Sequence, residues 1–391
     1  MLLKARILEH ASSLKDLIID TRRYFHRFPE LDYQVELTAG HINHIMKEND
    51  IPCRILPCGG VLAEIHGGKG GGPVCALRAD MDALPVAEET EASYVSTFPG
   101  KMHACGHDAH MASVIGAGLI INFLKADFRG LVKLLFQPAE ETTGGALSLI
   151  REGVLQNPQV DSVFGFHVTP DLPPGTLGVK NGKIRAASDM FDVTVRGASS
   201  HGAEPEKGVD AIAIASYLVS GLYQNLSRKI SPLDQAVLSV GEIHGGRARN
   251  VLCEEVKFSG LLRSIDEKTR IFLKEEIVRM VELIPGAMGG EGVVKFIEGY
   301  PSMVNDVSMT DRVRGSFRGL FPEGNIKELE YPSMGVDDFA YFLQHVPGSY
   351  FMFGTGGPYP LHNSRFDIDE GQLSRISALL AAIALNFIQE E

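Results

Sequence analysis

The sequence predicts an α/β protein: a largely parallel, three-layer α/β/α domain with a smaller two-layer βαββαβ domain inserted into it. Apolar runs of strand length alternate with helix-like segments through residues 60–180, which is the pattern of a parallel sheet. Reactive polar residues follow these runs, and such sheets place their sites at the carboxyl ends of strands. The length of 391 residues also suggests two domains rather than one core.

The elements of the larger domain are predicted in chain order. The N-terminal stretch, with a charge every few residues, is expected to form an amphipathic helix. Strands are expected at 61–67, 73–80, 131–139 and 160–168, which are four apolar runs. Ala109–Lys125 contains small and apolar residues without a breaker, so it is expected to be a helix. Residues 351–363 return to a strand followed by a glycine-rich loop.

The inserted domain is predicted from a different order of elements. Two helices are expected at Val209–Leu226 and Glu267–Leu283. Strands are expected at 188–197, 235–245, 250–264 and 292–300. The resulting order, βαββαβ, is that of a compact two-layer domain. We therefore expect a discontinuous larger domain of residues 1–186 and 299–391, interrupted by a smaller domain of residues 187–298.

Composition limits the classes of partner and compartment. The chain has 37 basic and 49 acidic residues, a net charge of −12, which opposes nucleic acid or an anionic membrane as the main partner. The N-terminus lacks a signal-peptide core, and no segment is expected to approach the roughly 20 apolar residues of a spanning helix. Five cysteines without a framework spacing indicate reduced thiols, so we expect a cytoplasmic protein.

The segment MHACGHDAH at 102–110 is the densest polar cluster in the sequence. Cys105 and His107 lie two residues apart before a predicted helix, and a thiolate and an imidazole both suit a borderline-soft divalent metal. A loop with chance histidines fits Cys-x-His equally well. Asp108 favours the metal hypothesis, because a ligating histidine needs an acceptor that orients it. His103 and His110 are expected to be supporting or structural residues.

The segment QPAEE at 137–141 places two adjacent carboxylates after an apolar strand. Carboxylates this close repel each other unless a cation or a shared proton intervenes. One of Glu140 and Glu141 could bind a metal while the other acts as a general base toward a metal-bound water. A solvated acidic turn is the alternative, but the preceding run LVKLLF has the composition of a buried strand.

Two further histidines raise the number of candidate ligands to five. His167 follows the apolar run VFGF, and His362 lies in a loop near the C-terminus. Each alone is weak, since a histidine at a strand end is more often structural. Together with Cys105, His107 and Glu141 they exceed what one metal needs, so the set predicts two metals with a shared ligand. Asp80 and Asp82 could orient ligands or could form a turn.

Three residues of the inserted domain are weaker candidates. Arg263 could bind a substrate carboxylate through two parallel hydrogen bonds. His201 and Asn250 have no local motif that supports a role. As isolated residues, all three are expected to be surface groups.

The motifs together resemble the co-catalytic metal aminoacylase/carboxypeptidase family. The resemblance is to the amidohydrolase branch, which includes hippurate hydrolases, auxin–amino acid conjugate hydrolases and N-acetyl-diaminopimelate deacetylases. It extends over nearly the whole chain, through RRYFHRFPEL, LRADMDALP, HACGHDAH, FQPAEE, FGFHVTP, SSHGAEPEKGVDA, GVDDF and LHNSRFDIDE. HACGHD with QPAEE at this separation is highly specific.

The resemblance implies a role for each ligand. Cys105 would bridge two metals, at a position where other branches have an aspartate. His107 and His167 would complete the shell of one metal, and Glu141 and His362 that of the other. The ions would be zinc, manganese, cobalt or nickel.

The resemblance also implies catalytic and substrate-binding roles. Glu140 would be the general base, and Asp82 would lie beside the metals. His201 would reach the active site of a partner subunit and polarise the scissile carbonyl. Asn250, also across the dimer, and Arg263 would bind substrate. The inserted domain would then be a lid and dimerisation domain.

The activity implied is hydrolysis of the amide bond of an N-acyl amino acid. A carboxypeptidase or dipeptidase acting on small peptides is the alternative. A thiol amidase that uses Cys105 with His107, and a binding protein without activity, are alternatives from other classes. The chain departs from the family pattern at Cys253–Glu254, Gly260–Leu261 and Asp337, all in the substrate-binding half, so the resemblance does not identify the substrate.

Overall fold

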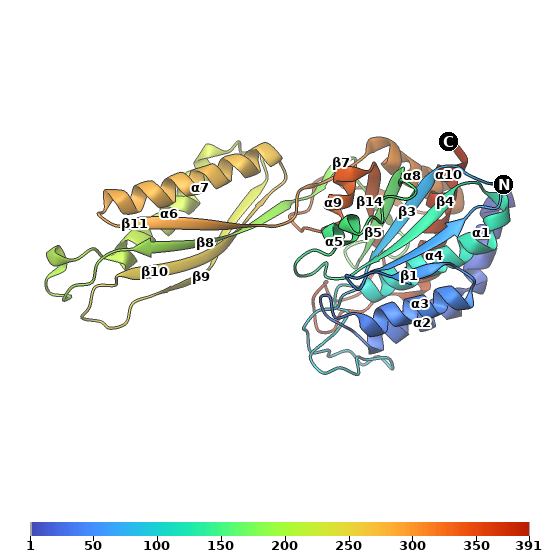
Figure 1. Cartoon of the computed structure of the whole chain (residues 1–391), viewed down its shortest axis with the longest axis horizontal. Coiled ribbons are helices and arrows are strands. Elements are labelled where there is room, and N and C mark those ends of the chain that lie inside the picture. Colours follow the sequence, from blue (N-terminus) through green and yellow to red (C-terminus); the bar gives the residue numbers. More distant parts are fainter. Residues whose placement is uncertain (1, 391) are drawn as a thin grey trace. The chain divides into compact units, whose positions relative to one another are not determined.

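The computed structural model describes residues 2–390, which form two compact units (Figure 1). The larger unit comprises Met1–Ile184, Val304–Tyr331 and Asp338–Glu391. The smaller unit comprises Arg185–Met303 and Pro332–Asp337. The sequence gives no indication that residues 332–337 return to the smaller unit.

The larger unit is built on an eight-stranded sheet. In spatial order its strands are β1 (Cys53–Ile55), β2 (Val61–His66), β4 (Leu131–Gln137), β3 (Val74–Asp80), β5 (Ser162–Thr169), β14 (Gly348–Gly354), β6 (Leu177–Val179) and β13 (Ile326–Glu328). The four central strands, β4, β3, β5 and β14, are parallel. β2 is antiparallel to β4, and β6 is antiparallel to β14. The largely parallel sheet is therefore confirmed, with antiparallel pairs toward both edges.

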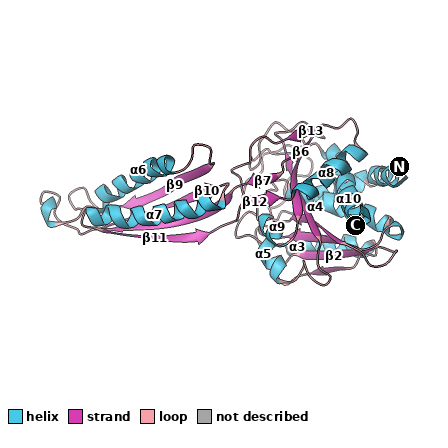
Figure 2. Ribbon diagram, turned by 90° about the horizontal axis from the view of Figure 1, so that it is seen from above, coloured by secondary structure: helices cyan, strands magenta, loops and turns pink. Residues whose placement is uncertain are grey.

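Helices cover both faces of this sheet, as the three-layer prediction requires (Figures 1 and 2). One layer contains α1 (Leu2–Ser13), α2 (Lys15–Arg27), α3 (Glu36–Glu48), α4 (His107–Phe123), α8 (Val307–Leu320) and α10 (Leu373–Glu390). These helices contribute to one large apolar core against the sheet. The shorter α5 (Ala146–Arg151) and α9 (Ala340–His345) lie on the opposite face and contribute nothing to that core.

Helix α4 is central to the larger unit because small residues let it approach its neighbours. A Cβ atom on Gly116 would meet Ser377 Oγ of α10 at 2.5 Å, and one on Gly118 would meet Leu134 Cδ1 of β4 at 2.5 Å. The helix predicted at Ala109–Lys125 is thus confirmed, but it begins two residues earlier, at His107. That start places the Cys-x-His segment at its N-terminus.

One apolar helix corrects an expectation from the sequence. Among the described residues, Glu370–Gln389 is long and apolar enough to cross a membrane, so the expectation of no such segment is wrong. However, 72% of its apolar stretch is buried inside the protein. Burial of that extent is typical of a core helix, and α10 packs against α4 and α8.

The smaller unit has the predicted βαββαβ order. Its elements are β8 (Ala187–Arg196), α6 (Ala211–Lys229), β9 (Ala236–Gly245), β10 (Glu255–Ser264), α7 (Glu267–Ala287) and β11 (Glu291–Glu298). The antiparallel sheet has the order β11-β8-β10-β9, and both helices pack on one face (Figure 1). The side chains of Asp210 and Asp266 cap the N-termini of α6 and α7.

The remaining elements are short. β7 (Gly182–Arg185) and β12 (Met303–Asn305) pair as a two-stranded sheet. Single 3₁₀ turns occupy Lys125–Asp127, Pro205–Lys207 and Glu370–Gln372.

Candidate metal centre

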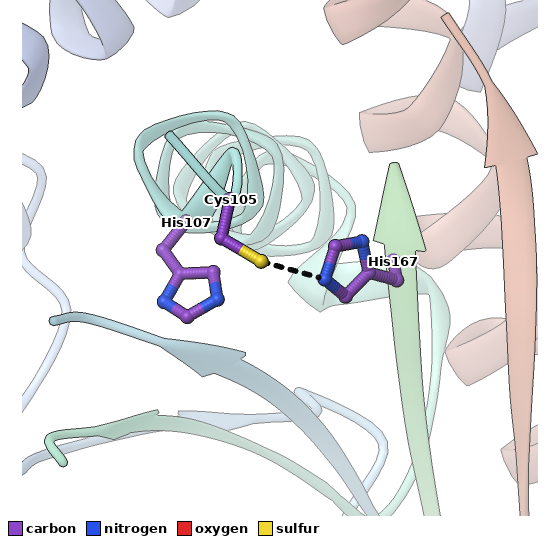
Figure 3. A group of neighbouring side chains, drawn as sticks. All are labelled: Cys105, His107 and His167. Carbon is purple, nitrogen blue, oxygen red and sulfur yellow. Dashed lines mark hydrogen bonds between the residues drawn. The ribbon is translucent and has the colours of Figure 1, made fainter. Parts of the chain in front are cut away.

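Cys105 lies at the centre of the predicted ligands. Its Sγ atom is 3.4 Å from His167 Nε2 of β5 and 3.3 Å from His362 Nε2. Figure 3 shows the Cys105 side chain between the rings of His107 and His167. The start of α4, the end of β5 and the loop after β14 therefore meet at one sulfur atom.

Glu141 completes a second group of donors around the same cysteine. Its Oε1 atom is 3.4 Å from His362 Nε2 and 3.8 Å from His107 Nε2. The structure thus brings the five predicted ligands into two groups that share Cys105: one with His107 and His167, the other with Glu141 and His362. Within each group the donor atoms all lie within 4.8 Å of one another.

The distances between these donor atoms are those expected for ligands of a shared divalent ion. Two ligand atoms that each lie about 2.1 Å from one tetrahedral ion are about 3.4 Å apart, close to the separations found here. His107 Nε2 and Glu141 Oε1 are buried, and neither has a hydrogen-bond partner among the described residues. Buried polar atoms without a partner are costly, and a cation between them would remove that cost. Sulfur, nitrogen and oxygen donors together suit borderline-soft divalent metals.

Asp82 contacts Glu140, Glu141 and His107. Its carboxylate accepts the backbone N–H groups of Glu140, at 2.9 Å, and Glu141, at 3.0 Å. Its backbone carbonyl lies 2.7 Å from His107 Nδ1. A proton on Nδ1 donates to that carbonyl and leaves the lone pair of His107 Nε2 for a metal. Ala139, with φ 57°, forms the tight turn that brings Glu140 and Glu141 to Asp82.

The expected role of Asp108 is wrong. Its carboxylate accepts a hydrogen bond from Arg22 Nε at 2.8 Å and lies 2.7 Å from His26 Nδ1, away from His107. Adjacent residues on a helix point about 100° apart, so Asp108 cannot share the direction of His107 in the first turn of α4.

The structure places the residues whose roles the sequence left open. His110 Nδ1 lies 2.6 Å from Asp80 Oδ1, and His110 Nε2 accepts the N–H of Val168 at 3.0 Å. His110 therefore links the end of β3 to β5 beside His167. His103 is buried, and burial lowers its pKa to about 3, so the ring is neutral.

The electrostatics of Cys105 oppose the thiol-nucleophile alternative. Burial, followed by the nearby Glu141 carboxylate, raises the pKa of the Cys105 thiol well above its ordinary value. Reactive cysteines show the opposite shift, because a neighbouring positive charge stabilises their thiolate. Burial alone would raise the pKa of Glu141, but His362 and His107 hold it below the ordinary value.

The other three predicted residues lie in the smaller unit. His201 pairs with Val251, and Gly202 N donates to the Asn250 carbonyl at 2.8 Å, so His201 and Asn250 are neighbours on an exposed surface. Asn250 precedes the first residue of β10, whereas Arg263 lies near the last residue of that strand. Arg263 donates to the Met334 carbonyl at 2.6 Å. The structure therefore brings His201 and Asn250 together but not with Arg263.

Two groups of metal donors with a further carboxylate, Glu140, beside them lie at the carboxyl edge of a parallel sheet. This arrangement is that of a metal-dependent hydrolase. Comparison with known proteins specifies the family. The chain belongs to peptidase family M20/M25/M40, whose model matches residues 76–386, so it is a hydrolase of amide bonds. The family resemblance seen in the motifs is confirmed.

The relatives are similar over nearly their whole length. The N-acetyl-L-cysteine deacetylase of Bacillus subtilis (strain 168) is 38% identical over 371 residues, 94% of this chain and 88% of the relative. Thermostable carboxypeptidase 1 of Saccharolobus solfataricus is 36% identical over 96% of both chains. A crystal structure of a dinuclear metal-binding M20 peptidase from Bacillus subtilis is 33% identical, with a TM-score of 0.86, and the match covers 97% of this chain and 99% of that one.

Proposed function

We propose that this hydrolase removes the acyl group from an N-acyl amino acid at a two-metal centre formed by Cys105, His107, Glu141, His167 and His362. The observation that supports this most strongly is the pair of donor groups sharing Cys105. A deacetylase of N-acetyl-L-cysteine among the relatives supports the same substrate class.

The chemistry divides between the ions and the protein. Two divalent ions held here would polarise the amide carbonyl and make a water more acidic. Glu140, which groups with His107 and Glu141, removes a proton from the attacking water. It then returns the proton to the leaving amine, so the products are a carboxylic acid and a free amino acid. His201 of a second subunit stabilises the negative charge that develops on the carbonyl oxygen.

Carboxypeptidase activity is the second candidate, because two relatives are named thermostable carboxypeptidases. Both activities hydrolyse an amide next to an amino acid, so the same metals and base serve either. They differ in what precedes the scissile bond, a simple acyl group or a peptide. The five cysteines, all free, suit a reducing compartment, so we also propose that the enzyme acts in the cytoplasm.

The first experiment combines elemental analysis with a hydrolysis assay on N-acyl amino acids and short peptides, with and without chelator. We expect about two zinc, manganese, cobalt or nickel ions per chain and chelator-sensitive release of free amino acid. Faster cleavage of peptides than of N-acyl amino acids would favour the carboxypeptidase. Absence of bound metal, with no activity after these ions are added, would contradict the proposed function.

We also propose a homodimer formed through the smaller unit. β9 is an edge strand whose exposed side chains include Val237 and Ile243, and exposed apolar edges favour pairing with another chain. A strand rises about 3.4 Å per residue, so Arg263 lies about 27 Å along β10 from Glu255, the first residue of the strand. His201 pairs with Val251, which precedes Glu255. One small substrate cannot contact both Arg263 and His201 of a single chain, which supports an active site shared between subunits.

This sharing predicts complementation between two inactive variants. Mixing His201→Ala with Glu140→Ala protein should restore activity, because each mixed dimer contains one site with an intact Glu140 and an intact His201. Random exchange should give up to about one quarter of wild-type activity. Separately tagged chains show whether mixed dimers form. Mixed dimers without any activity would contradict a site shared between subunits.

A further inference from the structure

A fully buried arginine on α2 contacts carboxylates from two segments that are distant in sequence. Arg22 Nε donates to Asp108 at 2.8 Å, Nη2 donates to Asp367 at 2.8 Å, and Nη1 donates to Glu370 at 3.1 Å. The Arg22 side chain is 0% exposed. Arg22 belongs to the motif RRYFHRFPEL, to which the proposed function assigns no role.

The two segments that Arg22 joins are those that contain Cys105 and His362, two donors of one group. Asp108 directly follows His107 and lies three residues after Cys105. Asp367 follows His362 by five residues. A planar guanidinium with several donors in fixed directions can hold two carboxylates at one separation, which a lysine cannot do.

His362 depends on such support more than the other ligands do. Its backbone has φ 66°, in the left-handed region that non-glycine residues avoid, and its side chain is 54% exposed. Strained conformations persist only where the surroundings fix them. The restraints on this loop include the bond from His362 N to the Ala104 carbonyl, at 2.8 Å, and the bond from Glu89 N to the Ser364 carbonyl, at 2.8 Å. They also include the contacts of Asp367 with Arg22 and Tyr94, which tie the loop to α2.

The charges explain why an arginine is needed between the loops. Asp108 and Asp367 each accept a hydrogen bond from the Arg22 guanidinium at 2.8 Å, so the cation lies between two carboxylates. Carboxylates this close repel each other without the cation. Loss of Arg22 would let the segment from His362 to Glu370 move away from α4.

We propose that Arg22 is a positioning residue that fixes His362 relative to Cys105, and so sets the occupancy of the metal position formed by Cys105, Glu141 and His362. This inference rests on the proposed function, because it takes these three residues as ligands. It predicts an unequal effect on the two metals. The position formed with His107 and His167 does not include the loop that Arg22 restrains through Asp367.

Three variants of the full-length protein test this inference. Arg22→Met removes the link. Asp367→Asn weakens it from the His362 side by removing one carboxylate charge, while leaving Arg22, Asp108 and the bond from Arg22 to Glu370 in place. Asp367 is 34% exposed, so its change is the gentler one and keeps the test available if Arg22→Met does not fold. The matched control is Lys133→Met, which removes another buried cation whose Nζ donates to the carbonyls of Val154, Gln156 and Pro158, none of them in the metal groups.

The measurement is Zn²⁺ stoichiometry and affinity, by titration against a chromophoric chelator, alongside thermal unfolding. We expect wild type and Lys133→Met to bind two ions, even where Lys133→Met lowers the temperature of thermal unfolding. Arg22→Met and Asp367→Asn should bind one ion normally and the second about 10- to 100-fold more weakly.

Native affinity for both ions in folded Arg22→Met or Asp367→Asn would overturn the positioning role and leave the proposed function intact. An equal loss in Lys133→Met would also overturn it, since general destabilisation would then explain the effect. Wild-type protein without zinc affinity would instead overturn the proposed function.

Discussion

Replacement of Glu140 by glutamine is expected to lower kcat by about 10²–10⁴-fold while two metals stay bound. Glutamine keeps the size and polarity of the side chain but cannot accept the proton of the attacking water. The hydrogen bond between Glu140 and Asp82 uses the backbone N–H, so the loop should keep its conformation. Glu140 is 8% exposed, and glutamine places no new charge there. The measurements are kcat on an N-acyl amino acid and metal content by elemental analysis.

The matched control is Glu152→Gln. Glu152 Oε1 accepts the N–H of Cys58, and Glu152 belongs to no group of metal donors among the described residues. We expect this variant to keep wild-type kcat. If Glu140→Gln protein binds two metals and turns over at a near wild-type rate, the general base is another residue.

The long elements could be predicted from sequence because their patterns are long. β3, β4 and β5 are mostly apolar and buried along seven or eight residues, and α4 has no proline over seventeen. β1, β6, β12 and β13 have three residues each, too few to show a period. The antiparallel pairing of β2 with β4 could not be predicted either. A short apolar run does not show whether its neighbour in the sheet runs parallel or antiparallel to it.

The donor types of the site were visible in local motifs, but their supports were not. Cys105 with His107, and Glu140 with Glu141, are pairs whose chemistry is apparent from two or three residues. The acceptor for His107 is the backbone carbonyl of Asp82, a group that every residue has and no sequence pattern marks. Asp108, the conspicuous local candidate, instead contacts residues on a helix more than 80 positions earlier.

Arg22 is the clearest example of a residue that sequence reasoning missed. Three carboxylates surround it, yet an arginine in a helix is usually a surface group, because a buried charge is costly unless paired. Its partners are 86, 345 and 348 residues away in the chain. Only the fold shows that they converge, and so only the fold shows that the loops of two ligands share one cation.

Replacement of Cys105 by alanine is expected to abolish both metal positions, because Cys105 is the donor common to the two groups. The remaining pairs, His107 with His167 and Glu141 with His362, each offer two donors and should bind metal weakly. Activity should fall to background, and elemental analysis should find less than one ion per chain. A thiol-nucleophile enzyme would also lose activity in this variant, so the alanine change alone does not separate the two mechanisms.

Cys105→Asp separates them. A carboxylate can bridge two ions but cannot form a thioester, so a bridging role predicts two bound ions and measurable hydrolysis in this variant. Oxygen is a harder donor than sulfur, so the preferred ion should shift toward manganese or magnesium. The assay therefore compares kcat of wild type and Cys105→Asp across zinc, cobalt, manganese and magnesium, with metal content measured in each. An aspartate variant that binds two ions yet hydrolyses nothing with any of them would mean that the sulfur of Cys105 does more than bridge.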